Sequence, residues 1–487
     1  MNADAAVKSG ARSKYAWREL ERVEPVKRSV PDRLGDFKKV DHPYDESTVS
    51  EQASRCVQCP NPNCVAACPL EVPIPQLLAL AAEGQFREAA ELLYTTQSLP
   101  EFIAHVCVEK RMCEAACVLE KPSAPVPIGS ISRFLLEYGW KHGVKEPPPL
   151  PVNGRRVIVI GSGLCGLVAA DALSRLGYTV TLMDSAREPG GRLVNGLAGF
   201  KVDRTVIGRR VQTLRERGVR FRMGMACGVD VGLEELRRGY DAVLFALGRT
   251  EAVPLEIPGA GLRGVCQAYP FILHHTSDAS LCAPPVSVRG RRVVVLGGGD
   301  TAMDALRVAL RAGAGDALCL YRRNRGQMPA DPRELENAVE EGARFHFLSQ
   351  PVAIIGSPDG DIKGVRCVRT ELGAPDHLGR SLVRCVADSE FDVPADVVLV
   401  AYGFAPPRLP VGGDLSVLAT DVNGCLTVDA AHMTNLPGVF AAGSIARWPI
   451  SMVGVMQDAR EAAAKIDQYL AAKVRVRDED CGRSQLG

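Results

Sequence analysis

Seven cysteines crowd the N-terminal part of this chain and precede two glycine-rich motifs typical of nucleotide-binding loops. They lie within 62 of the 487 residues, whereas the other nine cysteines are scattered singly. A disulfide framework would not divide sixteen cysteines in this way, but cluster or metal ligation gathers thiolates in short loops. The order of these features predicts one electron path, from a nicotinamide through a flavin to iron–sulfur clusters.

The composition is that of an ordinary globular protein with room for about three domains. Hydrophobic residues make up 46% of the chain and charged residues 24%. Because 58 Lys and Arg balance 57 Asp and Glu, no overall field would draw the chain to nucleic acid or to an anionic membrane. No apolar run approaches the roughly 18 residues of a membrane span, and the first residues are polar, unlike a signal peptide. We therefore expect a cytoplasmic protein.

The spacing of the seven cysteines favours iron–sulfur clusters. The first four form Cys-x2-Cys-x4-Cys-x3-Cys-Pro and the last three form Cys-x5-Cys-x3-Cys. A run that ends in Cys-Pro is typical of two-cluster ferredoxins, whose last cysteine serves the other cluster. Zinc, with four ligands in paired units, fits poorly, and structural thiols are the remaining alternative. Seven sulfurs leave two clusters one ligand short, so the eighth ligand is another group, comes from elsewhere or is absent.

The first glycine-rich motif lies in VIVIGSGLCGLVAADAL, between a predicted apolar strand and a predicted helix. Gly161 permits the tight turn, and Gly163, with Ser162 beside it, lets a pyrophosphate approach the backbone. Gly166 allows the helix to pack on the strand. Asp184 ends the next predicted strand about 20 residues further on, where an acid binds ribose hydroxyls. The pattern predicts a dinucleotide site, and a merely structural turn is the alternative.

The second motif, VVVLGGGDTAMDALRVAL, has the same predicted strand, glycine-rich turn and helix, but an alanine stands in the place of the third glycine. Its second strand ends in two arginines rather than an acid. A guanidinium can bind a 2′-phosphate through two hydrogen bonds, so the pattern favours NADP over NAD. Two solvated arginines are the alternative. The residues predicted to bind this nucleotide are Gly297, Gly299, Asp300, Thr301, Arg322 and Arg323.

The predicted fold class is α/β, with a helical iron–sulfur domain followed by two Rossmann-like dinucleotide-binding domains. The segment KEPPPLPVN holds four prolines and predicts a stiff linker. The predicted parts are an N-terminal arm (1–45), a helical cluster domain (46–144), the linker (145–153), a discontinuous flavin-binding domain (154–284 and 405–472), a domain that binds the nicotinamide nucleotide (285–404) and a C-terminal tail (473–487).

These motifs resemble the small subunit of bacterial glutamate synthase and the N-terminal half of dihydropyrimidine dehydrogenase. The resemblance covers the chain from about residue 46 to about residue 470. It rests on RCVQCPNPNCVAACP, CVEKRMCEAAC, PIGSISRF, GSGLCG, PGGRLVNGLAGFKVD, VVLGGGDTAMD, CLYRRNRGQMP, AYGF and GVFAAG. It implies a two-dinucleotide-binding flavoprotein that takes hydride from NADPH onto FAD. Single electrons then pass through two 4Fe-4S clusters to a second catalytic centre, on a partner chain or in a further domain.

The resemblance also implies the cluster ligands. One cluster takes Cys56, Cys59, Cys64 and Cys117. The other takes Cys68, Cys107 and Cys113, with Ser132 where the family has a Gln or Glu. A serine oxygen can ligate iron, but its shorter side chain needs a closer backbone. We therefore expect a second cluster that is labile, water-ligated or altered in potential.

For FAD, the resemblance implies Gly191 and Arg192, after the first acid, and the late motif with Gly443 and Ser444. Family members usually carry an Asp where this chain has Ser444, so FAD binding is expected to be weakened or retuned. Arg192 lies beside the isoalloxazine in this alignment and would stabilise an anionic reduced flavin. The alternative is a surface arginine.

The leading hypothesis is an NADPH-linked electron-transfer subunit of a hetero-oligomer. Its larger catalytic partner would be the glutamate synthase large subunit or another flavo-iron–sulfur enzyme. Hydride transfer needs positioning rather than a nucleophile, and no catalytic residue is predicted. One alternative is a free-standing NADPH:acceptor or NADPH:ferredoxin reductase. Another is a scaffold subunit that holds clusters but lacks flavin, motivated by Ser444. The direction of electron flow stays open.

Overall fold

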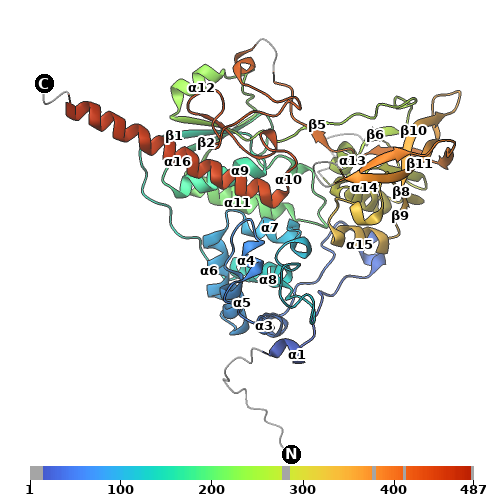
Figure 1. Ribbon diagram of the computed structural model, residues 1–487, viewed down its shortest axis with the longest axis horizontal. Helices are drawn as coiled ribbons and strands as arrows, with labels where there is room; N and C mark the ends of the chain where they lie inside the picture. Colours follow the sequence, from blue (N-terminus) through green and yellow to red (C-terminus); the bar gives the residue numbers. More distant parts are fainter. Residues whose placement is uncertain (1–14, 277–285, 376–379, 410–412, 484–487) are drawn as a thin grey trace, which may run out of the picture. The chain divides into compact units, whose positions relative to one another are not determined.

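The computed structural model describes residues 15–276, 286–375, 380–409 and 413–483, which form two compact units (Figure 1). The first unit holds residues 15–27 and 41–148, and the second holds residues 28–40 and 149–483. The division after Pro148 falls within the segment predicted as a linker. The predicted arm and tail extend in part beyond the described residues.

The predicted N-terminal arm is divided between the units, because residues 28–40 belong to the second unit. The chain leaves the first unit at Lys27 and returns at Asp41, and these two residues form an antiparallel bridge. One helix, Met452–Arg483, extends into the predicted C-terminal tail, so the predicted boundary at residue 473 falls within a helix.

The first unit is helical in its described regular elements. Three of its described helices begin where the sequence supplies a cap or a proline: the Asp45 carboxylate accepts from the Thr48 amide at 2.7 Å, and Pro75 and Pro100 lie in first turns. Helix α3 packs on α5, and α6 packs on α8, around fully buried side chains such as Leu77 and Ile131. The elements are α1 (Ala16–Glu19), α3 (Glu46–Ser54), α4 (Asn63–Ala66), α5 (Ile74–Ala82), α6 (Phe86–Thr96), α7 (Pro100–Val106), η1 (Glu109–Arg111) and α8 (Ile128–Lys141).

A five-stranded parallel sheet in the order β16-β4-β1-β2-β3 forms the first nucleotide-binding domain. Strand β1 is apolar and buried along most of its length, as expected for a parallel sheet covered on both faces. Strand β16 joins from the far end of the sequence, so this domain is discontinuous. Its strands are β1 (Arg156–Ile160), β2 (Thr179–Asp184), β3 (Arg220–Met223), β4 (Ala242–Phe245) and β16 (Val439–Ala441). Its helices are α9 (Leu164–Arg175), α10 (Arg192–Asn195), α11 (Arg204–Glu216), α12 (Leu233–Gly239) and α16 (Met452–Arg483).

A second five-stranded parallel sheet, in the order β6-β14-β7-β8-β9, forms the second nucleotide-binding domain. Strand β6 lies within the range predicted for the flavin domain, but it pairs with β14 here, so the second sheet begins earlier in the sequence than predicted. Its strands are β6 (Val265–Gln267), β7 (Arg292–Leu296), β8 (Asp316–Tyr321), β9 (Arg344–Phe347) and β14 (Val397–Val400). Its helices are α13 (Ala268–Thr276), α14 (Asp300–Arg311) and α15 (Pro332–Glu340).

Smaller elements complete the second unit. An antiparallel sheet, with β11 at its centre, is inserted between β9 and β14 of the second parallel sheet. A two-stranded ribbon, β5 with β15, lies in the segments that connect the two parallel sheets. The strands are β10 (Ser349–Gly356), β11 (Ile362–Pro375), β12 (Ser381–Cys385), β13 (Phe391–Pro394), β5 (Glu251–Ala252) and β15 (Phe404–Ala405). The short helices are α2 (Val30–Leu34), η3 (Arg325–Gln327), η4 (Asp414–Val417) and η5 (Gly443–Ile445).

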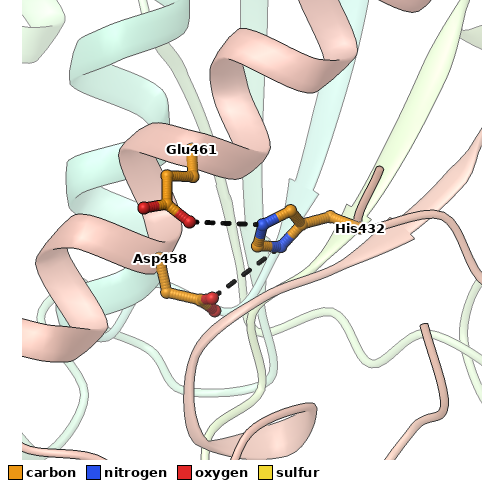
Figure 2. Close-up of side chains that lie close together, drawn as sticks. All are labelled: His432, Asp458 and Glu461. Atoms are coloured by element: carbon orange, nitrogen blue, oxygen red, sulfur yellow. Dashed lines mark ion pairs between the residues drawn. The ribbon is translucent and has the colours of Figure 1, made fainter. Parts of the chain in front are cut away.

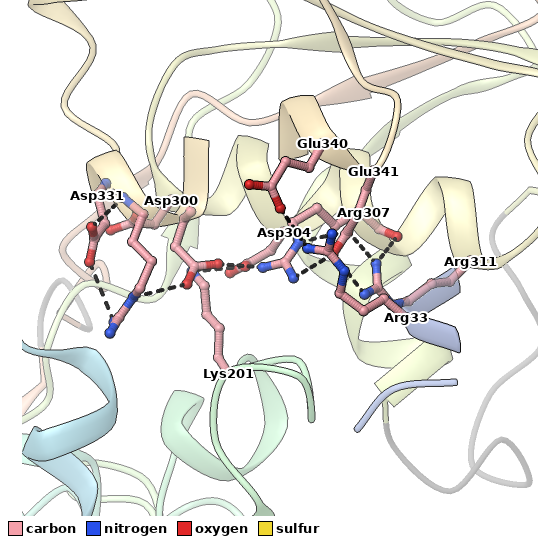
Figure 3. Close-up of polar contacts among 11 residues, drawn as sticks. Arg33, Lys201, Asp300, Asp304, Arg307, Arg311, Asp331, Glu340 and Glu341 are labelled. Carbon is pink, nitrogen blue, oxygen red and sulfur yellow. Dashed lines mark hydrogen bonds and ion pairs between the residues drawn. The ribbon is translucent and has the colours of Figure 1, made fainter. Parts of the chain in front are cut away.

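A buried charge network holds segment 28–40 on the second nucleotide-binding domain (Figure 3). The Glu341 carboxylate accepts from Arg307 at 2.9 Å and from Arg311 at 2.6 Å. Arg33, on α2, lies 3.0 Å from Glu340 and 3.7 Å from Glu341. Removing one member of such a buried group would leave an uncompensated charge, so these ion pairs fix the segment in place.

A second buried pair links the two nucleotide-binding domains of this unit. The Lys201 ammonium, from the loop that follows α10, lies 2.8 Å from the Asp304 carboxylate on α14. Burial raises the pKa of Asp304 to about 6, although Lys201 acts in the opposite direction. The pair is therefore mostly charged near neutral pH, where it fixes the loop against α14.

We expect Glu341→Gln to lower the free energy of unfolding by about 3–5 kcal/mol, because the buried arginines lose their shared counter-ion. Glu336→Gln, at an exposed position on α15, is the matched control and should change it by less than about 0.5 kcal/mol. Urea unfolding at neutral pH measures both. Equal effects of the two substitutions would contradict the assigned role of the network.

The stabilisation by Glu341 should also depend on pH. Burial raises the pKa of this carboxyl, but the hydrogen bonds from Arg311 and Arg307 outweigh burial and lower it to about 2. A lowered folded-state pKa gives stability that is present above the ordinary pKa and is lost as pH falls toward the folded value. The difference between wild type and Glu341→Gln should therefore shrink between about pH 5 and about pH 2.

Candidate cofactor sites

One pocket in the first unit gathers four of the seven predicted cluster ligands. Its lining includes Cys56, Cys59, Cys64 and Cys117, and apolar side chains such as Leu78 and Ile128 form the rest of the wall. Cys56 and Cys59 precede α4, Cys64 lies within it, and Cys117 comes from the segment before α8. Burial raises the pKa of the Cys64 thiol to about 11, and the neighbouring Cys56 and Cys117 add to the effect. Thiols that suppress one another's ionisation fit a cationic iron centre, which would compensate the thiolate charges.

The other three cysteines form a second group. Burial raises the pKa of the Cys113 thiol, and Cys107 and Cys68 act in the same direction, which places the three close together. Ser132 lies on α8 and is partly buried. In the described part of the chain, no hydrogen bond ties its hydroxyl to these thiols. Ligation of iron by Ser132 stays a prediction.

Two buried acids beside the second cysteine group were missed by sequence reasoning. Glu114 is nearly inaccessible, and its carboxylate accepts from the Gly129 amide at 3.0 Å and pairs with Arg22 at 2.9 Å. Glu109 pairs with Arg133 at 3.3 Å. Both acids raise the pKa of Cys113, after the larger effects of burial and Cys107. The only sequence signal was their position beside the cysteines.

The backbone of the first nucleotide loop has the geometry that the predicted role of each glycine requires. Gly161 has a φ of +106°, and a Cβ there would lie 2.6 Å from the Ala246 carbonyl oxygen. A Cβ at Gly166 would lie 1.8 Å from the Gly161 carbonyl oxygen. At Gly163, by contrast, an added Cβ would meet no protein atom within 4 Å. The loop is thus closed on the protein side and open at Gly163, which fits a pyrophosphate at the N-terminus of α9.

Asp184 lies beside this loop at the end of β2. Its Oδ2 accepts from the Ser162 amide at 2.6 Å and from the Ser162 hydroxyl at 2.7 Å, and its Oδ1 accepts from the Ala186 amide at 2.9 Å. A carboxylate has about four lone-pair sites, so it can accept further bonds from ribose hydroxyls. Asp184 therefore both fixes the loop and fits the predicted ribose site.

The other predicted flavin residues approach the same loop. A Cβ on Gly191 would lie 3.1 Å from the Gly163 Cα, so Gly191 packs directly against the glycine turn. Ser444 follows β16, and its hydroxyl would lie 3.8 Å from a Cβ at Gly248, which follows β4. The structure thus brings together the two sequence-distant halves of the predicted flavin site.

A cluster of His432, Asp458 and Glu461 was not predicted from the sequence (Figure 2). His432 faces Asp458 at 3.8 Å and Glu461 at 3.7 Å. The three could offer ligands to a metal ion, but the Arg447 guanidinium already lies 2.5 Å from Asp458 and supplies the positive charge. The other Asp458 oxygen accepts from the Gly443 amide at 2.6 Å. The cluster therefore braces the turn at Gly443 and Ser444.

The second nucleotide loop is equally open. Gly297 has a φ of +136° and turns against the Ala401 carbonyl, whereas a Cβ at Gly299 would meet only Pro329, at 4.0 Å. The Asp300 carboxylate accepts from the Asp331 amide at 3.0 Å and fixes the loop that precedes α15. Thr301 lies in the first turn of α14 and is partly buried. This cradle fits a second dinucleotide.

The two predicted phosphate-binding arginines differ in their surroundings. Arg322 is exposed after β8, near the half-buried Tyr402. Arg323 is partly buried, and its Nε donates to the Ser381 carbonyl at 3.0 Å. Arg322 is thus the better placed to receive a 2′-phosphate.

Comparison with known proteins places the chain in a family. Residues 33–144 match the family described as dihydropyrimidine dehydrogenase domain II, 4Fe-4S cluster, and residues 155–465 match pyridine nucleotide-disulphide oxidoreductase. The glutamate synthase [NADPH] small chain of Escherichia coli K12 is 38% identical over 472 residues, covering 94% of this chain and 98% of that one. This chain belongs to the glutamate synthase small-chain family. A family member from Azospirillum brasilense is 39% identical over 460 residues, covering 92% of this chain and 95% of that one.

Two further similarities concern the family's architecture. The putative oxidoreductase AegA of E. coli K12 is 36% identical over 466 residues, which cover 93% of this chain and 70% of that protein. The family fold is also that of Mycobacterium tuberculosis FprA, solved in complex with NADPH, with a TM-score of 0.57 at 20% identity over 67% of this chain and 86% of that one.

These matches confirm the predicted family, the fold class and the enzyme class, a pyridine-nucleotide-dependent flavin oxidoreductase with an iron–sulfur domain. They confirm FAD, NADPH and 4Fe-4S iron as the cofactors, whereas the number of clusters and the individual site residues stay predictions. Within the described residues, no helix combines the length and apolar character needed to cross a membrane. The cytoplasmic localisation also stays a prediction.

We expect Gly163→Ala to abolish FAD retention without destabilising the FAD-free protein, because the added methyl meets no protein atom and Gly163 has an ordinary φ of −71°. Gly166→Ala should instead lower the stability of the FAD-free protein by about 1–3 kcal/mol, since its methyl overlaps the Gly161 carbonyl. FAD released on denaturation and thermal unfolding of the FAD-free protein measure the two effects. Wild-type FAD content in Gly163→Ala would rule out the proposed pyrophosphate site.

Proposed function

We propose that this chain takes hydride from NADPH onto FAD and passes the electrons singly, through two 4Fe-4S clusters, to a larger catalytic subunit. The observation that carries the proposal is the presence, on one chain, of a four-thiol pocket and two open dinucleotide loops. When bound, FAD supplies the conversion between a two-electron donor and one-electron clusters. The chain's own residues bind and position the groups between which electrons move.

Each part has a defined task in this proposal. The open backbone at Gly163 receives the FAD pyrophosphate, and Asp184 receives its ribose hydroxyls. Gly299 and Arg322 hold NADPH by its pyrophosphate and its 2′-phosphate. The two cysteine groups hold the clusters, with Ser132 or another group completing the second. No proton needs to be moved by a side chain in the hydride step.

The partner is proposed from the family. Relatives named glutamate synthase small chain are covered almost completely by this chain, so we propose a large glutamate synthase subunit or a related flavo-iron–sulfur enzyme as the electron acceptor. AegA offers a second arrangement, since a similar chain forms only part of that longer putative oxidoreductase. A free-standing reductase, which would need no partner chain, remains the second candidate.

Anaerobic purification with FAD and iron quantification tests this function. We expect about one FAD and roughly eight iron atoms per chain, and bleaching of the flavin band on addition of NADPH. Copurification with a larger subunit would favour the partner-bound form, whereas elution alone with reduction of a soluble acceptor would favour the free reductase. Iron without flavin would overturn both and leave the scaffold alternative, which the serine at position 444 motivates.

We expect Cys64→Ser to remove roughly four of about eight iron atoms, because it breaks the four-thiol pocket and leaves the second group intact. Cys113→Ser should remove the other four. Cys385→Ser, at an exposed position outside both groups, is the matched control and should keep all the iron. Iron analysis and low-temperature EPR of the reduced protein measure the outcome. Full iron content in both test variants would contradict the ligand assignment.

We expect Arg322→Ala to raise the KM for NADPH about 10- to 100-fold, since a charge-assisted bond to the 2′-phosphate contributes roughly 1.5–3 kcal/mol. The KM for NADH, which lacks this phosphate, should barely change. Lys363→Ala, at an exposed position on β11, controls for a general loss of positive charge. A parallel rise of the KM for NADPH and the KM for NADH would show that Arg322 does not bind the 2′-phosphate.

A further inference from the structure

Arg249 is a buried cation at the carboxyl edge of the first sheet, in the turn that follows β4. Its Nε donates to the Phe404 carbonyl at 2.7 Å, its Nη1 donates to the Cys425 sulfur at 3.3 Å, and its guanidinium stacks on Trp448 at 4.5 Å. These contacts position the group without neutralising it. Only 8% of the residue is exposed.

Arg192 reaches the same place from another loop. It follows Gly191, which packs on Gly163, and its guanidinium stacks on the ring of Phe404 at 4.3 Å. Burial lowers the pKa of Arg192, the neighbouring Tyr269 acts in the opposite direction, and the charge of Arg249 lowers it further. Arg192 is partly buried beside a second cation, which favours the prediction of a flavin-side arginine over the alternative of a surface arginine.

No carboxylate of the described residues lies within ion-pair distance of Arg192 or Arg249. The contrast with the rest of the second unit is sharp. Its other buried arginines lie 3.0 Å (Arg33), 3.5 Å (Arg210) and 2.5 Å (Arg307) from a carboxylate. The Asp421 carboxylate interacts with Arg249 electrostatically but forms no ion pair with it. Because two like charges without an ion-paired carboxylate are costly to bury, the pair favours an anionic guest.

The strand order indicates which guest lies there. At the carboxyl edge, Asp184 ends β2 and the glycine turn follows β1, whereas Arg249 follows β4 and Ser444 follows β16. In the order β16-β4-β1-β2, the ribose site and Arg249 therefore lie on opposite sides of the phosphate loop. Arg192 comes from the loop after β2, but its contact with Phe404 places it with Arg249. A dinucleotide bound through Asp184 and Gly163 directs its other half, the flavin, towards Arg249 and Arg192.

We propose that Arg192 and Arg249 form a cationic pair that binds the negative charge of reduced flavin and keeps it anionic. The inference rests on the proposed FAD placement. In the hydride step, the C4–H bond of NADPH breaks and its electron pair forms the N5–H bond, so NADPH becomes NADP⁺ and FAD becomes FADH⁻. No proton is taken up, and the new negative charge is balanced by the two guanidinium groups.

The pH dependence of the flavin midpoint potential tests the proposal on the wild-type holoprotein. If reduced flavin stays anionic, two electrons accompany one proton, and the potential should change by about 30 mV per pH unit from about pH 8 to about pH 5.5. A slope of about 59 mV per pH unit at the acidic end means that reduced flavin is protonated, and it would overturn the proposal. Absence of FAD, measured beforehand, would instead be a failure of the proposed function.

Variants supply a second readout that does not depend on turnover. Sulfite adds to flavin N5 and leaves a negative charge on the ring, so its dissociation constant reports the cationic pair. Arg249→Gln and Arg192→Gln should each raise this constant tenfold or more, whereas Arg249→Lys should largely retain the wild-type value. Arg263→Gln, at an exposed position, is the control. Unchanged sulfite affinity in both Gln variants that retain FAD would overturn the proposal. If both variants lose FAD, the pH dependence of the wild-type flavin midpoint potential alone tests the proposal.

Discussion

The carboxyl edge of the first parallel sheet is the constraint on which the candidate flavin site depends. Gly161, Asp184, Gly248 and Ser444 are far apart in the sequence, but each ends or follows a strand of this sheet. Parallel strands present these ends at one edge, so the turns converge there. Closing the sheet with β16 requires the chain to return after forming the second sheet, which explains why the domain is discontinuous.

Buried cations occur in two opposite environments within the second unit. Around Glu341 and Asp304, every buried cation meets a carboxylate, and the result is a fixed framework that includes segment 28–40. At Arg192 and Arg249, carbonyl, sulfur and aromatic groups position the cations, and no described carboxylate forms an ion pair with either. The first arrangement stabilises the fold, whereas the second suits a ligand that becomes negative during the reaction.

Sequence reasoning succeeded where a local rule dictates the backbone. The roles of Gly161, Gly163 and Gly166 follow from φ and close approach, and the sorting of the seven cysteines followed from the family resemblance, which the geometry matches. It missed features that depend on long-range packing. Neither the place of segment 28–40 nor the role of Asp458, which braces Gly443 from a helix fifteen residues later, has a local signature. Arg249 was overlooked because its significance lies in the absence of an ion-paired carboxylate, and only the three-dimensional packing reveals that absence.

The order of reduction after rapid anaerobic mixing with NADPH tests the central claim most directly. The account predicts that the flavin band bleaches first and that the iron–sulfur absorbance falls afterwards, with both phases present in wild type. In Gly163→Ala, which lacks the open approach for FAD, neither phase should occur with NADPH, although dithionite should still reduce the clusters. Direct reduction of the clusters by NADPH in that FAD-free variant would contradict the account.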